Sequence, residues 1–230
     1  MSVNIVAYKK IAGELKNTNV ALVAVSKTKP VEEILELYNL GQRDFGENYV
    51  QELIEKCGQL PKDIRWHFIG HLQSNKVKHI APFISLIQSA DSKKLLIEIN
   101  RQAQKNNRII DCLLQMHIAR EDTKFGLDEN ELKEIMHINL SELRNIRIAG
   151  LMGMASLTND PNTIKNEFQY LKKLFDKYFQ SSTGDPRRNN GAGQYQSPIL
   201  SMGMSSDYEI AVQEGSNMVR IGSLLFGSRN

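Results

Sequence analysis

A lysine stands at the end of an apolar run near the N-terminus. Residues 20–25 read Val-Ala-Leu-Val-Ala-Val, and they are followed by Ser26, Lys27 and, three positions later, Pro30. A continuous apolar stretch predicts a strand buried on both faces, and the proline predicts the start of a helix. Lys27 would then lie at the rim of a hydrophobic core, where desolvation disfavours the charged amine. Only the neutral amine attacks an aldehyde, so the position suits a Schiff base with a cofactor or a carbonyl substrate. The alternative is a strand-end lysine that reaches solvent.

Two short segments near the C-terminus carry residues that suit an anion. Residues 203–206 read Gly-Met-Ser-Ser and residues 220–223 read Arg-Ile-Gly-Ser, and both adjoin short apolar runs. Backbone amides at the start of a helix point at a bound anion, and the helix dipole favours its charge. Ser205 adds a hydroxyl, Gly222 allows close approach of the backbone, and Ser223 offers its amide and hydroxyl. The plainer interpretations are helix caps for Ser205 and Ser206, a turn at Gly222 and a carboxylate partner for Arg220.

Strand and helix signals alternate along the whole chain and determine where these residues lie. An amphipathic helix is expected first, over residues 4–16. Strands are expected over residues 20–26, 43–46, 65–69, 84–88, 109–118, 146–152, 199–202 and 218–221. Helices are expected over residues 30–40, 49–56, 74–80, 92–105, 128–137, 162–179, 206–214 and 224–226.

Eight strand–helix units predict an α/β fold, a single (β/α)8 TIM-type barrel domain over residues 1–230 with an extra N-terminal helix. The alternative is a doubly wound open sheet, whose usual glycine-rich turn is missing after the first strand. Barrel enzymes place their sites at the carboxyl ends of the strands, and the eighth strand neighbours the first. The expected phosphate site therefore lies beside Lys27. A lysine beside a phosphate site is what binding of pyridoxal 5′-phosphate (PLP) requires.

Other polar and sulfur-containing residues have plainer interpretations. His67 lies inside the third apolar run and is expected as a hydrogen-bonded core residue rather than a catalyst. His71 and Asn75 follow that run and are expected to hold a loop. The methionines at positions 116, 152, 154, 202 and 204 are expected to fill the core, although Met204 also belongs to the candidate anion segment. Residues 181–198 are rich in Gly, Asn, Ser and Arg, which predicts a flexible surface loop away from the site.

Composition excludes several classes of function. The 230 residues carry a net charge of +3, with both signs interspersed. Because no basic stripe with interleaved aromatic residues occurs, we do not expect nucleic-acid binding. No apolar run approaches the ~20 residues of a membrane span, and the N-terminus lacks the apolar core of a signal peptide. Cys57 and Cys112 lack a CxxC context, which favours a reducing compartment. We expect a soluble, cytoplasmic protein.

Six segments together resemble the YggS/PROSC family of PLP homeostasis proteins, whose fold is that of the N-terminal domain of alanine racemase. They are AVSKTKP at 24–30, FGENYVQE at 45–52, WHFIGHLQSNK at 66–76, GLM at 150–152, LSMGMS at 200–205 and VRIGS at 219–223. The segments occur in the family's order and span nearly the whole chain. The departure is the polar segment at 181–198, which is usually shorter in relatives.

The resemblance implies a role for each candidate residue. Lys27 would carry PLP, and Lys29 would be a second amine for transfer of the cofactor. Arg220 would meet the pyridine nitrogen or the phosphate. The implied cofactor-binding set is Lys27, Asn48, Met204, Ser205, Arg220, Gly222 and Ser223, and the resemblance implies no catalytic or metal-binding residue.

Three functions stay open on this basis. A cationic Arg220 at the pyridine nitrogen would oppose the protonation that carbanion-forming PLP enzymes use. Alanine racemase also needs a second acid/base and a second domain, for which a chain ending at Asn230 leaves no room. We therefore expect a monomeric PLP carrier with little or no turnover, with PLP-dependent apo-enzymes as candidate acceptors. The first alternative is a fold-type III PLP enzyme, such as an amino-acid racemase, with His67 or Tyr49 as its base. The second is a cofactor-free aldolase-type enzyme in which Lys27 attacks a carbonyl substrate.

Overall fold

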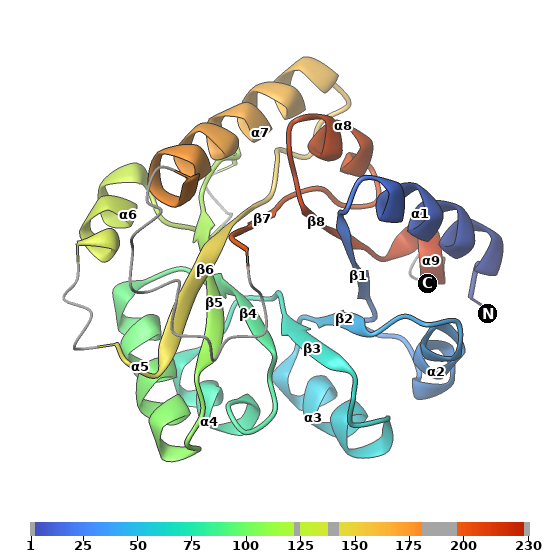
Figure 1. The fold of residues 1–230 in the computed structure, drawn as a ribbon, viewed down its shortest axis with the longest axis horizontal. Coiled ribbons are helices and arrows are strands. Elements are labelled where there is room, and N and C mark those ends of the chain that lie inside the picture. Colours follow the sequence, from blue (N-terminus) through green and yellow to red (C-terminus); the bar gives the residue numbers. More distant parts are fainter. Residues whose placement is uncertain (1–2, 122–124, 138–142, 181–196, 228–230) are drawn as a thin grey trace.

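The computed structural model describes residues 3–121, 125–137, 143–180 and 197–227, and within these ranges eight parallel strands close into a barrel. Each strand pairs with the next along the chain, and β8 pairs with β1 (Figure 1). The strands are β1 (Ala21–Val25), β2 (Asp44–Glu47), β3 (Arg65–Phe68), β4 (Leu86–Ala90), β5 (Ile110–Met116), β6 (Ile146–Gly153), β7 (Ile199–Ser201) and β8 (Met218–Ile221). The predicted (β/α)8 barrel is confirmed, and the open sheet is excluded.

Helices surround the barrel on its outside (Figure 1). They are α1 (Ile5–Asn17), α2 (Val31–Asn39), α3 (Val50–Gln59), α4 (Val77–Ile80), α5 (Lys93–Lys105), α6 (Glu129–Met136), α7 (Pro161–Phe175), α8 (Tyr208–Gln213) and α9 (Ser223–Phe226). A 3-10 turn, η1 (Ser74–Lys76), precedes α4, and a π-helical turn, η3 (Asp176–Gln180), continues α7. The expected boundaries hold to within a few residues. Of the surface loop predicted at 181–198, residues 181–196 lie outside the described part of the chain.

The helix starts follow from local sequence. The side chain of Ser92 accepts a hydrogen bond from the backbone N–H of Leu95 and caps α5. Asp128 and Glu131 form a capping box at the start of α6. Asp160 caps α7 ahead of a proline in its first turn. Each cap satisfies backbone amides that the first helical turn leaves without an intrahelical partner.

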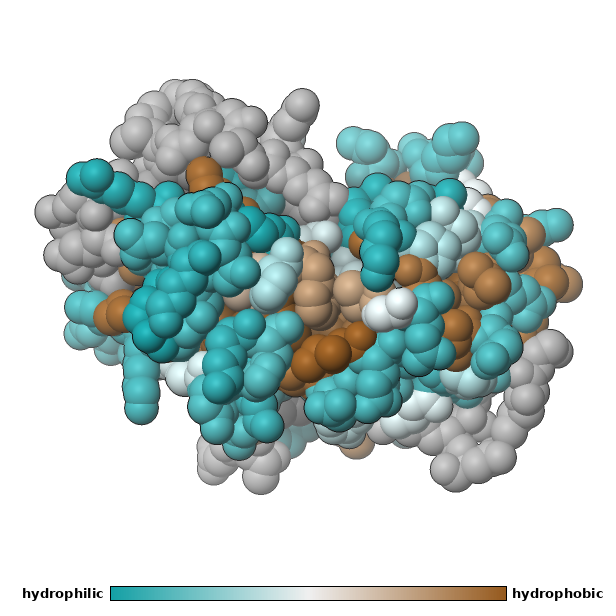
Figure 2. Space-filling model, turned by 90° about the horizontal axis from the view of Figure 1, so that it is seen from below, coloured by the Kyte–Doolittle hydropathy of each residue, from teal (hydrophilic) through white to brown (hydrophobic). Residues whose placement is uncertain are grey.

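Apolar side chains form two clusters, one outside and one inside the barrel wall. The larger cluster packs the helices against the strands. The smaller one consists of Val23, Leu86, Leu113, Ala149, Met152, Ile199 and Met218. The face seen in Figure 2 is mostly hydrophilic, with hydrophobic residues showing near its middle and toward the right of the view. None of the described helices is long and apolar enough to cross a membrane.

The N-terminal helix α1 packs against α9, at the other end of the chain. It lies beside α9 (Figure 1), and the backbone N–H of Asn4 donates to the carbonyl of Leu225 over 2.8 Å. The extra helix expected from the sequence therefore supports the short helix that follows β8.

A β-bulge in β6 brings the backbones of β6 and β7 into close contact. The pairing of β5 with β6 shifts between Cys112↔Ile148 and Leu113↔Gly150, which leaves Ala149 as the extra residue. Gly150 has φ +155°, and a Cβ at this position would lie 1.8 Å from the carbonyl oxygen of Ile199. Closure of the barrel at β7 therefore requires glycine here.

We predict that Gly150→Ala lowers the free energy of unfolding by about 3 kcal/mol, because the added methyl group must push the β7 backbone away. Urea unfolding followed by circular dichroism measures the effect. Gly13→Ala in α1 is the matched control, since a Cβ there meets nothing within 4 Å. In an exposed helix interior that change should stabilise the protein by about 1 kcal/mol. Equal stability of Gly150→Ala and the wild type would contradict the prediction.

Candidate functional site

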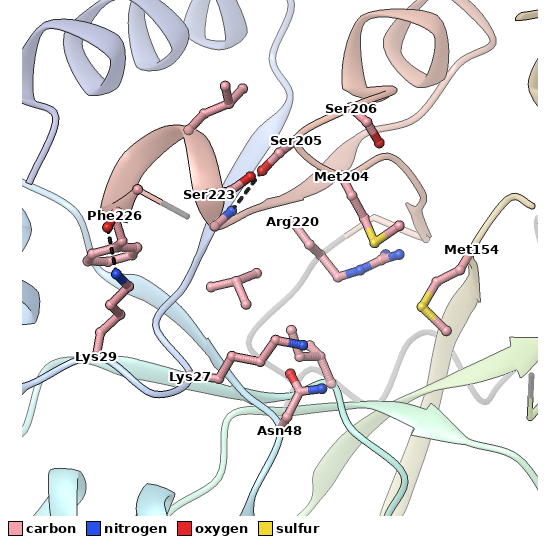
Figure 3. Close-up of a pocket in the computed structure, with 15 residues that line it drawn as sticks. Lys27, Lys29, Asn48, Met154, Met204, Ser205, Ser206, Arg220, Ser223 and Phe226 are labelled. Atoms are coloured by element: carbon pink, nitrogen blue, oxygen red, sulfur yellow. Dashed lines mark hydrogen bonds between the residues drawn. The ribbon is translucent and has the colours of Figure 1, made fainter. Parts of the chain in front are cut away.

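One cavity of about 420 Å³ opens at the carboxyl ends of the strands and contains every predicted site residue. The seven are Lys27, Asn48, Met204, Ser205, Arg220, Gly222 and Ser223 (Figure 3). Lys29 lines the same cavity. The remaining lining residues, which the sequence did not single out as site residues, are Val25, Ile69, Met154, Ser206, Leu224, Phe226 and Gly227. Two methionines expected as core filler, Met154 and Met204, thus border the cavity.

Closure of the barrel places the lysine loop beside the serine-containing turn. β1 and β8 pair in parallel, with Val23 opposite Arg220 and Ala24 opposite Ile221. The residues that follow these two strands therefore leave the barrel side by side. Figure 3 shows the side chain of Lys27 extending into the cavity toward Asn48, which follows β2.

A buried network clamps the backbone on both sides of Lys27. The amine of Lys56 on α3 donates to the carbonyl of Ser26 over 2.7 Å and to Glu47 and Glu52 over 2.8 and 2.6 Å. The Ser26 hydroxyl donates to Glu47 over 2.6 Å, and the Thr28 N–H donates to Glu52 over 2.6 Å. The same three side chains therefore hold residues 26 and 28.

This network, the clamp formed by Lys56, Glu47 and Glu52, holds a strained backbone conformation at Thr28 and buries the carboxylate of Glu47. Thr28 has φ +63°, a region that β-branched residues rarely adopt and that costs about 1–3 kcal/mol. Burial raises the pKa of Glu47, and its hydrogen bonds and ion pair with Lys56 oppose that rise. The second oxygen of this carboxylate, Oε2, is buried without a hydrogen-bond partner. Strain and desolvation are concentrated directly behind Lys27.

The guanidinium of Arg220 is buried among neutral groups. It donates to the Ser201 hydroxyl over 2.5 Å and to the carbonyl of Gly153 over 3.0 Å. Its two hydrogen-bond partners are neutral, and the carboxylate considered from sequence acts on it through the charge of Asp207. Burial lowers the pKa of Arg220 to about 10, and the charge of Asp207 opposes that shift. The side chain therefore stays cationic at neutral pH, and its guanidinium points between Met154 and Met204 (Figure 3).

Asn48 presents an unused acceptor. Its Oδ1 is buried without a hydrogen-bond partner in the structure. Leaving a buried polar atom unpaired costs about 1–3 kcal/mol, so such an atom at a cavity wall indicates a place for a ligand donor.

The turns after β7 and β8 interlock. The Gly222 N–H donates to the Ser205 hydroxyl over 3.2 Å, as the dashed line in Figure 3 marks. Ser205 is not a helix cap, because α8 begins at Tyr208 and the N-terminal position is held by Asp207. A Cβ on Gly222 would lie 3.2 Å from the carbonyl oxygen of Val25, so a larger residue here would press against the end of β1. The first amides of α9 follow directly, in a turn that leaves them without intrahelical partners.

Lys29 is held away from Lys27. Its amine donates to the carbonyl of Phe226 over 2.6 Å and lies 4.0 Å from Glu33. The cation thereby satisfies a carbonyl at the end of α9, where the helix dipole favours positive charge. The role of Lys29 as a second cofactor amine stays a prediction.

The two bases considered for a racemase do not line the cavity. His67 is fully buried in the barrel, and Tyr49 is 55% exposed outside the cavity. His71 hydrogen-bonds Asp91 and stacks on Phe125. Across the described ranges no group of three or more His, Cys, Asp or Glu residues could hold a metal ion.

Comparisons with known proteins agree with this arrangement. The family model for the N-terminal domain of alanine racemase matches residues 4–230. A pyridoxal phosphate homeostasis protein of Aquifex aeolicus is 42% identical over 90% of this chain and 86% of its own length. The human protein of that name is 39% identical over 91% of this chain and 76% of its own length. The structure of PipY from Synechococcus elongatus, with PLP bound, superposes with a TM-score of 0.81 at 34% identity, over 96% of this chain and 100% of that one.

We predict that Glu52→Ala speeds hydrogen–deuterium exchange in residues 26–29, because the Thr28 amide loses its acceptor and Lys56 loses one anchor. The free energy of unfolding should fall by about 1–3 kcal/mol. Glu55→Ala is the control, since Glu55 lies on the same helix and its side chain accepts a hydrogen bond from the exposed Gln51, away from the network. That variant should stay within about 0.5 kcal/mol of wild type. Unchanged exchange in Glu52→Ala would show that the clamp does not hold this turn.

Proposed function

Because the chain belongs to the pyridoxal phosphate homeostasis proteins, within the fold family of the alanine racemase N-terminal domain, we propose that it binds PLP in this cavity. Its role would be PLP homeostasis, with little or no turnover of amino acids. The relatives that share its family carry that function in their names, and PipY binds PLP on the same fold. The barrel would act as a single PLP-binding domain.

The proposal rests on a cavity that contains an unused hydrogen-bond acceptor and a buried positive charge, both of which PLP could satisfy. Asn48 Oδ1 is a buried, unused acceptor, and Arg220 is a buried cation with neutral partners. Ser205, Gly222 and Ser223 line the cavity together, where they would meet the phosphate. The volume lies within the range of small-ligand pockets, about 300–1,000 Å³.

Lys27 is the residue we assign to covalent attachment. Its side chain enters the cavity, whereas the amine of Lys29 is engaged by Phe226. The neutral amine of Lys27 would condense with the aldehyde carbon of PLP, forming a C=N bond and releasing water. When bound, PLP supplies an electron sink for amino-acid chemistry.

The titratable groups around the cavity favour holding the cofactor over turning over a substrate. Lys27, Lys29 and Arg220 are the titratable residues among the described residues that line it, and all three are bases with cationic forms. Such a set stabilises a phosphate dianion. A racemase would need a second acid/base opposite Lys27, and neither His67 nor Tyr49 borders the cavity. We therefore favour the carrier over a fold-type III enzyme.

Three finer points belong to the same proposal. The acceptors of the cofactor would be PLP-dependent apo-enzymes, the protein would act as a monomer, and its location would be the cytoplasm. Size-exclusion chromatography with light scattering tests the monomer, and reactivation of an apo-enzyme by the PLP-loaded protein tests delivery.

We predict that the purified protein, loaded with PLP, shows a visible Schiff-base band that borohydride abolishes while fixing the cofactor to Lys27. Peptide mass mapping locates the adduct. Lys27→Ala should lose both the band and the adduct, and Lys29→Ala should keep both. Failure of the wild type to take up PLP would overturn the proposed function, and an adduct on Lys29 in the wild type would overturn the assignment of Lys27.

We also predict no measurable racemisation of alanine or serine by the PLP-loaded protein, because racemisation needs acid/base groups on both faces of the cofactor, neither His67 nor Tyr49 lines the described cavity, and the amine of Lys29 is engaged by Phe226. Chiral chromatography of the amino acid measures racemisation, with a known racemase as the positive control. Lys27-dependent racemisation well above that of free PLP would favour the enzyme instead.

A further inference from the structure

A continuous chain of side-chain hydrogen bonds crosses the interior of the barrel from Arg220 to the opposite end. Ser201 accepts from Arg220 over 2.5 Å and donates to Gln88 Oε1 over 2.7 Å. The Gln88 amide lies 2.8 Å from His67 Nδ1, and His67 Nε2 lies 3.1 Å from Asp44 Oδ1. The chain thus links β8, β7, β4, β3 and β2 in turn.

The chain is buried along its length. Ser201, Gln88 and His67 are 0% exposed, and Arg220 is 3% exposed. At the far end Asp44 also forms a two-pronged ion pair with Arg65, whose side chain reaches the surface at the amino ends of the strands. Polar side chains that fill a barrel interior in this way displace the apolar layers that would otherwise pack there. A buried polar chain is costly unless each of its groups is satisfied, and here each member has a hydrogen-bond partner.

Both ends of the chain have a fixed hydrogen-bonding role. Arg220 is a donor only, because its guanidinium has no acceptor and stays protonated at neutral pH. Asp44 is an acceptor only at neutral pH. Burial raises its pKa, but hydrogen bonds from Arg65 and His67 and the charge of Arg65 outweigh burial and hold that pKa well below its usual value.

Two neighbours fix the orientation of Gln88 between those ends. Its amide nitrogen lies 3.3 Å from the Met218 sulfur, which is a weak acceptor and would repel the amide oxygen. The opposite orientation would also make Ser201 accept twice, from Gln88 and from Arg220. The buried Ser201 proton would then have no acceptor among its neighbours in the described structure. Gln88 therefore donates to His67 Nδ1, and His67 carries its proton on Nε2.

We propose that Ser201, Gln88 and His67 are positioning residues that fix the guanidinium of Arg220 at the cavity wall. Every link runs from donor to acceptor in one direction, from the cation of Arg220 to the carboxylate of Asp44. Reversing any member leaves a buried group unpaired, so the chain has a single low-energy arrangement. Arg220 is then pre-oriented toward the cavity before any ligand enters, which reduces the entropy that binding must remove. For PLP as the ligand, the inference rests on the proposed function.

Imidazole nitrogen NMR of the ligand-free protein tests the direction of the chain independently of PLP. With ¹⁵N-labelled histidine, we expect the His67 ring to show a bare Nδ1 and a protonated Nε2 at pH 7. The signal is assigned by its loss in His67→Phe or, where that variant does not fold, by its shift in Gln88→Met. A protonated Nδ1 on His67 in the wild type would overturn the proposal.

Ligand affinity tests the effect on Arg220. Ser201→Ala removes one of the two acceptors of Arg220, and Gln88→Met breaks the chain with little change in volume. Each should weaken PLP binding by about tenfold, the effect of losing about one hydrogen bond to a charged group. Ser201→Thr, which keeps the hydroxyl, should restore most of that affinity. Gln102→Met is the control, since Gln102 is a comparably buried glutamine on α5 that bonds Glu98 outside the chain.

Outcomes of the two experiments separate this inference from the proposed function. Wild-type affinity in folded Ser201→Ala and Gln88→Met would overturn the positioning role. Equal losses in Gln102→Met would mean that general destabilisation explains the effect, and would also overturn it. Failure of the wild type to bind PLP would remove the proposed function, while the imidazole spectrum would still decide whether the chain is ordered as described.

Discussion

The buried positive charge of Arg220 is the constraint to which most of the site responds. A guanidinium inside a barrel loses its hydration, and burial lowers its pKa, an effect that the charge of Asp207 only partly opposes. Its charge is spread instead over the Ser201 hydroxyl and the Gly153 carbonyl. Two neutral acceptors compensate a cation only in part, because a charge in a low-dielectric interior remains costly. The free side of the guanidinium therefore favours an electron-rich ligand in the cavity.

A second buried cation, Lys56, lies behind Lys27 and stabilises the fold rather than a bound ligand. Lys56 is almost fully paired, with two carboxylates and one carbonyl around its amine. Its charge is thus consumed in holding the β1 loop, including the strained Thr28. Lys56 and Arg220 therefore have different roles. Lys56, whose charge is paired with carboxylates, stabilises the structure, whereas the charge of Arg220, whose hydrogen-bond partners are neutral, favours binding of an anionic ligand. Lys27 projects from the loop that Lys56 holds, toward the cavity that Arg220 borders.

The sequence predicted the barrel and the site because both depend on local signals. Apolar runs gave the strands, and the rule that barrel sites lie at carboxyl ends placed Lys27 near Gly222. Lys56 could not be found this way, since a lysine on an amphipathic helix is indistinguishable from a solvated one. Its burial follows from how α3 packs over β2. The bulge at Ala149 and the unused Asn48 oxygen also depend on three-dimensional register. His67 was correctly expected in the core, but its connection to Arg220 requires the inner-face neighbours Gln88 and Ser201.

For the proposed carrier role, the composition of the cavity wall is the feature that would set this protein apart from a racemase of related fold. Catalysis by PLP needs protons delivered and removed at the substrate carbon, on defined faces of the cofactor. The described cavity wall supplies Lys27, Lys29 and Arg220, methionines and small hydroxyl groups, but no carboxylate, imidazole or phenol. A pocket of this composition suits binding of a phosphate and reversible attachment of an aldehyde. Lys27 could move a proton on its own face of the cofactor, and proton transfer on the opposite face would need a further group or solvent. This composition is the physical basis on which we propose a carrier.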